Sequence, residues 1–351
     1  MDLLILALAF LIILAGAELF TNGVEWFGRK LGLAEGAVGS VLAAVGTALP
    51  ETTIPIVAIL FSSGAHSNEV GLGAILGAPF MLATLAMFVT GAAVLWQARR
   101  REAGDVMPID GAVLRIDLLW FFGMYGLAIA AALVLPVEPT WPKAIVALVL
   151  LAAYGRYVAQ HFAMDAAAEL EDLAPLRLHR LDRGAQRAEP REPRLRIVSV
   201  QVMLAVACIV VGAVVFVEAV DQLARSIGIS EVLLALVIAP IATELPEKLN
   251  SVIWIRQGKD TLALGNITGA MVFQSAIPVS VALVFAPEAW SVASGNYTAF
   301  ASAGIALVAT LLIFWPAVRG GPGRLRGRRL LLGGAFYVVY LALIAVVISQ
   351  G

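Results

Sequence analysis

Long apolar runs alternate with short polar segments along the whole chain. The runs are continuous and do not alternate apolar with polar side chains at every second residue, which favours helices over the strands of a membrane barrel. Each run is close to the roughly 20 residues that a helix needs to cross a bilayer. The pattern predicts ten membrane-spanning helices, at residues 2–24, 36–60, 72–96, 113–135, 142–163, 197–222, 230–255, 262–286, 296–316 and 330–349.

One polar segment is much longer than the others. It covers residues 164–196, is rich in arginine, and lies between the fifth and the sixth predicted helix. We interpret it as a cytoplasmic linker that divides the chain into a first five-helix unit, residues 1–163, and a second, residues 197–351. The predicted fold is therefore an all-α integral membrane protein built from two such units.

The two units resemble one another in sequence. Residues 31–51 read LGLAEGAVGSVLAAVGTALPE and residues 227–247 read IGISEVLLALVIAPIATELPE, at a constant offset of 196 residues that extends back to Gly16 and Gly212. Because each unit holds an odd number of helices, we expect the second to be inserted upside down. An inverted repeat of this kind is typical of secondary transporters, whose substrate site lies between the repeats near the membrane midplane.

Positive charge sets the expected orientation. Most arginines and lysines outside the helices follow the odd-numbered helices, with dense groups at 99–101 and 324–329, and the other loops hold almost none. Cytoplasmic loops of membrane proteins carry such an excess. We therefore expect these loops in the cytoplasm and both termini outside, in a bacterial inner membrane.

Composition narrows the function classes. The chain has 351 residues, of which 60% are hydrophobic and 14% charged, against about 45–50% and about 25% in soluble proteins. A net charge of −1 argues against nucleic acid as a partner. The single cysteine, Cys208, excludes an internal disulfide or a cysteine metal cluster. His66, His161 and His179 show no ligand spacing, and we expect them at the surface or the membrane interface.

Two carboxylates stand inside apolar runs, each directly after a proline. Glu51 follows Thr47 by one helical turn and Glu247 follows Thr243 in the same way, so each pair shares a helix face. A carboxylate at the bilayer centre costs about 3 kcal/mol or more unless it is paired, protonated or coordinating. A proline also frees a backbone carbonyl, and hard cations bind carbonyl, hydroxyl and carboxylate oxygens. The pattern predicts a cation site; the alternative is a kinked helix with a neutral, hydrogen-bonded glutamic acid.

These segments also resemble a known family. The two G/A-T-x-L-P-E stretches, the five-plus-five layout, GAILGA at 73–78, GNITGA at 265–270 and GAELFTNGVEWFGRKLG in the first helix are similar to the alpha repeats of the calcium:cation antiporter superfamily, which includes the sodium/calcium exchangers. The resemblance implies a transporter rather than an enzyme, with cations as cargo, no tightly bound cofactor and no obligate protein partner. It also implies that Glu51 and Glu247 bind the ion, with Thr47 and Thr243 as ligands one turn earlier and Ala44 as a carbonyl ligand.

The chain departs from the family pattern at several positions. The family serines after G-T are replaced by Ala48 and Glu244, and the carboxamide or carboxylate of the eighth helix is replaced by Gln274. The remaining polar groups gather on the second unit. The complete set of expected site residues is Ala44, Thr47, Glu51, Thr243, Glu244, Glu247, Asn266, Gln274 and Ser275.

Lys248 stands four residues after Glu244, the favourable orientation for a helix ion pair. Three interpretations remain open: a structural salt bridge, a tethered cation that shifts the coupling ion to a proton, or a side chain that points into a water-filled vestibule. The leading functional hypothesis is an antiporter that exchanges Ca²⁺ or another divalent cation for Na⁺ or H⁺ by alternating access. The alternatives are a proton-coupled monovalent cation exchanger and a non-transporting membrane protein with a degenerate site.

Overall fold

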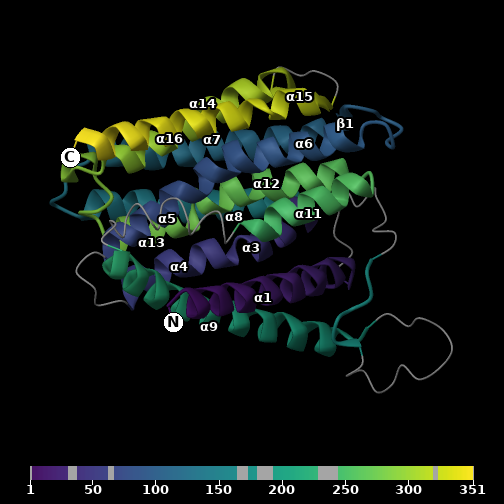
Figure 1. Cartoon of the computed structure of the whole chain (residues 1–351), viewed down its shortest axis with the longest axis horizontal. Coiled ribbons are helices and arrows are strands. Elements are labelled where there is room, and N and C mark those ends of the chain that lie inside the picture. The colour runs from purple at the N-terminus through teal and green to yellow at the C-terminus, as the bar shows by residue number, and fades with distance from the viewer. Residues whose placement is uncertain are drawn as a thin grey trace.

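The computed structural model describes residues 2–30, 38–61, 67–163, 173–179, 193–227, 244–318 and 323–350, which form a bundle of nearly parallel helices (Figure 1). Within these ranges, eight helices are long and apolar enough to cross a membrane, or nine if one bent pair counts as a single span. The prediction of a helical membrane protein is confirmed. The seventh predicted helix, 230–255, lies partly outside the described residues, so the count of ten stays a prediction.

The first unit holds the helices that precede the linker. They are α1 (Asp2–Lys30), the π-helical segment η1 (Val38–Ala43), α3 (Ala44–Thr47), α4 (Leu49–Leu60), α5 (Ser67–Met81), the π-helical segment η2 (Leu82–Ala86), α6 (Met87–Gln97), α7 (Gly111–Val134) and α8 (Trp141–Phe162).

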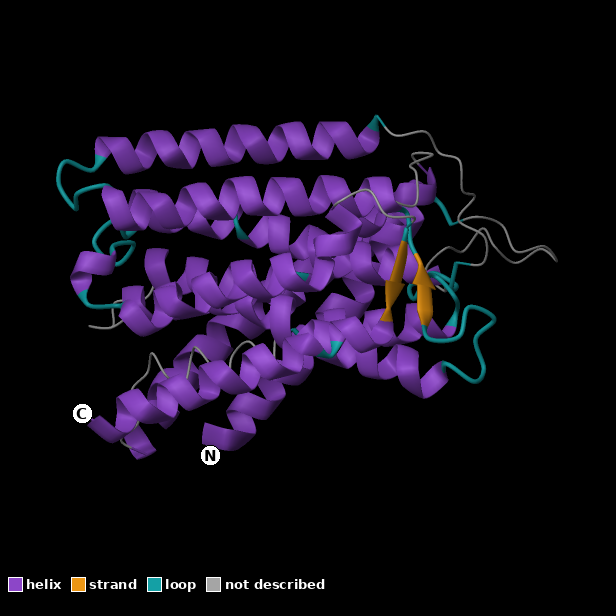
Figure 2. Ribbon diagram, turned by 90° about the horizontal axis from the view of Figure 1, so that it is seen from above, coloured by secondary structure: helices purple, strands orange, loops and turns teal. Residues whose placement is uncertain are grey.

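The second unit follows the linker. It holds α9 (Leu195–Ile227), α11 (Leu245–Arg256), α12 (Asp260–Gln274), α13 (Ile277–Phe285), the 3-10 turn η4 (Val292–Ser294), α14 (Tyr297–Val318), α15 (Gly327–Leu330) and α16 (Leu332–Gln350). Two short strands, β1 (Val106–Pro108) and β2 (Arg324–Arg326), pair antiparallel and join the two units at one end (Figure 2).

Prolines break the second and the eighth predicted helix. Residues 40–47 and 51–60 meet at an angle of 55°, and α4 begins with a proline in its first turn. Proline lacks the amide hydrogen that a helix interior needs, but the first turn leaves that hydrogen without an intrahelical partner in any case. The eighth predicted helix, 262–286, corresponds to one candidate span over residues 260–285. Within it the helix is interrupted locally between α12 and α13, and Pro278 stands in the first turn of α13.

Helices α1 and α9 form an intimate pair at one side of the bundle (Figure 1). A Cβ atom placed on Gly16 would lie 2.8 Å from Cγ1 of Ile209, and one placed on Gly212 would lie 2.8 Å from Cγ1 of Ile13. Glycine is therefore required on both helices for this close approach. The two contacts are reciprocal, since the offset of 196 residues that relates Gly16 to Gly212 also relates Ile13 to Ile209.

The two ends of the bundle differ in character. Both chain ends lie opposite the end that carries β1 (Figure 1). At the β1 end, Arg101 binds both carboxylate oxygens of Asp260, with 2.9 Å between Nη1 and Oδ1, and also donates to the carbonyl of Ile255. This buried ion pair ties the loop after α6 to the start of α12, so it fixes the two units to each other at that end.

Candidate functional site

The first segment expected at the site meets the eighth helix in the core. Thr47 Oγ1 donates a hydrogen bond to Asn266 Oδ1 at 3.1 Å, and both side chains are fully buried. Helix α12 reaches this position because Gly269 packs on the backbone of η1. A Cβ at Gly269 would lie 2.1 Å from the carbonyl oxygen of Ser40. The structure therefore brings the G-T-x-L-P-E and G-N-x-x-G-A segments together.

The break between α3 and α4 lies within the core, at the buried residue Ala48. Gln274 Nε2 donates to the carbonyl of Ala48 at 3.3 Å, directly before α4 begins. Glu51 is buried in the first turn of α4, with 4% of its surface exposed. Ala44 is also buried, and its carbonyl oxygen lies 3.5 Å from Thr47 Oγ1. The first-unit residues expected at the site thus lie around one kink.

Three polar atoms of the expected site residues have no hydrogen-bond partner among the described residues. They are Gln274 Oε1, Asn266 Nδ2 and Glu244 Oε1, all buried. Ser275 behaves differently, because its hydroxyl donates to the carbonyl of Val272 at 2.8 Å on its own helix. Buried polar groups in proteins are nearly always satisfied, so the two oxygens, Gln274 Oε1 and Glu244 Oε1, are candidate cation ligands, whereas Asn266 Nδ2 can only donate.

Glu244 and Lys248 form a buried ion pair. Lys248 Nζ lies 3.1 Å from Glu244 Oε2, and both side chains are almost entirely enclosed. The predicted pairing is confirmed, and the interpretation of Lys248 as a vestibule-facing side chain is wrong. Glu244 takes the position directly before α11 that Ala48 takes before α4, so the substitution places a carboxylate at the second helix start.

Two expected residues cannot be located. Thr243 lies outside the described residues, and Glu247 stands in the first turn of α11 with a side chain that is also outside them. Within the described part of the chain, no three His, Cys, Asp or Glu side chains gather as a metal cluster. The convergence of Glu51 and Glu247 on one ion therefore stays a prediction.

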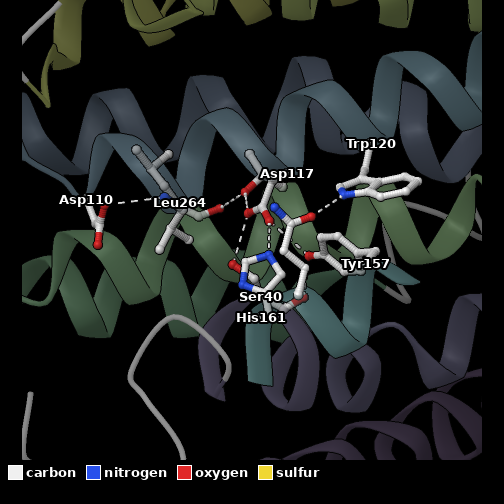
Figure 3. Close-up of polar contacts among 10 residues, drawn as sticks. Ser40, Asp110, Asp117, Trp120, Tyr157, His161 and Leu264 are labelled. Atoms are coloured by element: carbon white, nitrogen blue, oxygen red, sulfur yellow. Dashed lines mark hydrogen bonds and ion pairs between the residues drawn. The ribbon is translucent and has the colours of Figure 1, made fainter. Parts of the chain in front are cut away.

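A second buried polar cluster lies beside this place, centred on Asp117 of α7 (Figure 3). Its Oδ1 is 2.9 Å from His161 Nε2 and 2.9 Å from the Tyr157 hydroxyl. Its Oδ2 is 2.9 Å from Ser40 Oγ and 2.6 Å from Thr268 Oγ1. The cluster joins α7, α8, η1 and α12.

The expectation that the histidines lie at a surface is wrong for His161, which is fully buried. The ring can be buried because its Nε2 hydrogen-bonds with the Asp117 carboxylate of another helix. His179 is exposed as expected, and His66 lies outside the described residues. Sequence reasoning did not single out Asp117, although a carboxylate inside the predicted helix 113–135 is the same signal that identified Glu51.

The sequence pattern of the family described as sodium/calcium exchanger protein matches residues 1–162 and 197–349. The chain belongs to this family. The unmatched residues between the two blocks coincide with the predicted linker. The resemblance to the calcium:cation antiporter superfamily is confirmed, and the protein is a membrane transporter rather than an enzyme.

Sequence relatives agree with this assignment. The chain is 25% identical to the inner membrane protein YrbG of Escherichia coli (strain K12) over 352 residues, which cover 97% of this chain and 95% of YrbG. It is 30% identical to the protein CaxA of Alkalimonas amylolytica over 123 residues, which cover 35% of this chain and 37% of CaxA. The chain thus matches little more than a third of CaxA.

Solved structures share the fold. An H⁺/Ca²⁺ exchanger, CAX, superposes with a TM-score of 0.71 at 16% identity, over 98% of this chain and 82% of that one. The sodium-calcium exchanger NCX_Mj, soaked with Na⁺ and Sr²⁺, superposes with a TM-score of 0.62 at 17% identity, over 97% of this chain and 99% of that one. Identities this low show a common fold, and that fold is the one used by membrane cation exchangers.

Proposed function

We propose that this cation antiporter exchanges a divalent cation, Ca²⁺ first, for Na⁺ or H⁺ by alternating access at a site between two inverted five-helix repeats. The observation that carries the proposal is the buried contact of Thr47 with Asn266, beside polar atoms that lack partners among the described residues. It joins a helix of the first unit to a helix of the second. A ligand held there contacts both units, as alternating access requires.

The reciprocal packing of α1 and α9 supports the inverted repeat. Gly16 and Gly212 occupy equivalent positions of the two units. Gly16 packs against Ile209 and Gly212 packs against Ile13, and these two isoleucines are equivalent to each other as well. Such reciprocity arises when two related segments face each other across a pseudo-two-fold axis. The matching helix starts at α4 and α11 follow the same relation.

The donor set suits a hard cation. In the proposed site Glu51 supplies a carboxylate, Gln274 an amide oxygen and Ala44 a backbone carbonyl, and all three residues are buried. Oxygen ligands of this mixed kind are those that Ca²⁺ prefers. In the proposed site Thr243 and Glu247 complete the coordination from the second unit, whereas Ser275 supports α12 from outside it.

The charge of the Glu244–Lys248 pair bears on which cation the site exchanges. The Lys248 ammonium group neutralises Glu244, so Glu51 and Glu247 are the carboxylates that bind the divalent cation in the proposed site. A second candidate function, proton-coupled exchange of a monovalent cation, is favoured by the same pair if Lys248 itself replaces one cargo charge. In the proposed orientation the β1 end faces the cytoplasm and both termini face outside, in the inner membrane.

Flux in liposomes separates these functions. The purified protein, reconstituted with calcium- and pH-sensitive dyes, should admit Ca²⁺ only when an outward Na⁺ or H⁺ gradient is imposed. K⁺ or Na⁺ movement coupled to protons, without any divalent flux, would select the monovalent exchanger. The absence of cation exchange under every gradient would contradict the proposed function.

A further inference from the structure

Asp117 is a buried carboxylate that the proposed exchange site does not use. Its side chain is fully enclosed, and its four contacts come from α8, η1 and α12 (Figure 3). Of these partners, only His161 carries a positive charge when protonated. The charge of the Asp117–His161 pair therefore depends on the number of protons that the pair holds.

That dependence has a simple consequence in a low-dielectric core. With one proton, the pair is neutral overall, either as an ion pair or as a carboxylic acid beside a neutral imidazole. Without that proton, one negative charge remains in the membrane interior, which costs several kcal/mol unless another charge compensates it. Within the described residues, His161 Nδ1 has no hydrogen-bond partner, so Asp117 is the polar partner of the ring.

Two hydroxyl groups of the cluster have alternative acceptors. The Tyr157 hydroxyl lies 2.9 Å from Asp117 Oδ1 and 3.0 Å from the carbonyl of Ser40. The Thr268 hydroxyl lies 2.6 Å from Asp117 Oδ2 and 3.0 Å from the carbonyl of Leu264. Each hydroxyl has one proton to donate. With Asp117 ionised, both donate to the carboxylate; with it protonated, both can turn to the backbone of η1 and α12.

A pocket leads from the surface to this cluster. It lies between α7 and α12, with Asp110 and Thr261 at one end and Asp117 and Thr268 at the other. The lining residues of each helix follow a helical repeat, so the pocket runs along two facing helix sides. Asp110 is exposed at the start of α7. The pocket therefore approaches Asp117 from the β1 end of the molecule, although the Asp117 side chain itself is fully enclosed.

Other ionisable groups near the pair are few. Tyr157 and, behind it, Tyr154 come from α8, with 5.8 Å between their ring centroids. Asp260 at the start of α12 is paired with Arg101, and η1 contributes only hydroxyl and backbone groups. Arg115 of α7 and Arg156 of α8 are exposed, as is Tyr297 of the neighbouring α14. Among the described residues, His161 is thus the cation that faces Asp117.

We propose that Asp117 and His161 together bind one proton, separate from the exchanged cation and linked to its site, and that this proton enters through the pocket between α7 and α12. The link rests on the proposed function; proton binding by the pair does not. Ser40 lies in η1, the segment that leads directly into α3 and Thr47. Thr268 follows Asn266 by two residues, about 3 Å along the helix axis.

The sign of the link follows from charge. A unit charge on the order of 10 Å away, at an effective dielectric constant of about 20, changes an affinity by on the order of tenfold. A cation bound near Glu51 and Asn266 therefore favours release of the proton, and proton uptake favours release of the cation. Because coupling between two sites is reciprocal, each ligand expels the other, which is the property that an antiporter needs.

Infrared difference spectroscopy across a pH titration tests proton binding without requiring transport. The wild-type protein should show a pH-dependent signal of the pair, either a carboxylic-acid C=O band or imidazolium ring bands. Asp117→Asn and His161→Gln should each remove that component, and the control Glu102→Gln, an exposed carboxylate, should keep it. Tyr157→Phe removes a hydroxyl that contacts Asp117, so it should alter the same component. A difference spectrum that neither Asp117→Asn nor His161→Gln changes would overturn the proposal.

Exchange measurements then test the link. In liposomes, Asp117→Asn should flatten the pH dependence of cation flux, whereas Glu51→Gln should stop flux at every pH. A wild-type protein without any exchange would contradict the proposed function and leave the infrared result standing. Exchange with an unchanged pH profile in Asp117→Asn and His161→Gln would refute the link alone.

Discussion

Around Asp117 each carboxylate oxygen has two hydrogen-bonding contacts, from side chains of three other elements. Among the expected exchange-site residues, by contrast, Gln274 Oε1 and Glu244 Oε1 have no hydrogen-bond partner among the described residues, although they are equally buried. Both clusters include residues of α12 and of the adjoining segments η1 and α3. They differ in whether their buried polar atoms have hydrogen-bond partners. Asp117 can accept a proton because the Tyr157 and Thr268 hydroxyls can turn to backbone carbonyls instead, whereas in the proposed exchange site the amide oxygen of Gln274 binds a cation.

The largest effect should come from neutralising the carboxylate at the kink. We predict that Glu51→Gln and Glu247→Gln each reduce cation exchange to the level of protein-free liposomes, because the cargo loses a charged ligand. Glu18→Gln is the matched control, since Glu18 is an exposed carboxylate paired with Arg177. Retention of the protein in detergent as a single species shows that folding is intact. Full flux in Glu51→Gln would remove this residue from the site.

Gly269 allows α12 to pack closely on η1, and both clusters depend on this contact. Gly269→Ala should destabilise the protein by about 1–3 kcal/mol, the usual cost of overpacking, because the new methyl group meets the backbone of Ser40. Gly123→Ala is the control, with nothing within 4 Å of its added Cβ. Thermal unfolding in detergent measures both. Equal stability of the two variants would show that α12 does not need this close approach.

The Glu244–Lys248 pair should behave as one unit. Glu244→Ser leaves a buried cation that repels the cargo, so it should be more damaging than Lys248→Leu, and the double variant should recover part of the lost flux. A double-mutant cycle should give a coupling free energy of about 0.5–3 kcal/mol, as for residues in contact. Simple additivity would place Lys248 outside the energetics of the site.

The smallest expected effect concerns the orientation in the membrane, which sets the side at which the pocket beside Asp117 opens. In a background without Cys208, cysteines at Glu102 and Gln186 should react with a membrane-impermeant reagent from the cytoplasmic side alone. Neither cysteine should react with reagent added outside, because the arginine-rich loops are expected to face the cytoplasm. Labelling of either position from outside would reverse the orientation and the direction of proton entry.

Local features of this fold follow from the sequence more directly than its contacts do. Pro50 and Pro246 indicate a local disturbance of the helices predicted at 36–60 and 230–255, and both stand in the first turn of a helix, α4 and α11. Ion pairing of Lys248 follows from its spacing to Glu244, one turn away. The Asp117 cluster is different, since Ser40 and Thr268 stand 77 and 151 residues from Asp117. Hydrophobic periodicity shows that a helix is buried, but it does not show which side chains of distant helices meet.

Direct cation binding tests the comparison most closely. Calorimetric titration of Ca²⁺ into the detergent-solubilised protein, in buffers of different ionisation enthalpy, measures both affinity and the number of protons released. The account predicts that wild-type protein binds Ca²⁺ and releases protons, that Glu51→Gln does not bind, and that Asp117→Asn binds while releasing fewer protons. Undiminished Ca²⁺ binding by Glu51→Gln would contradict the account.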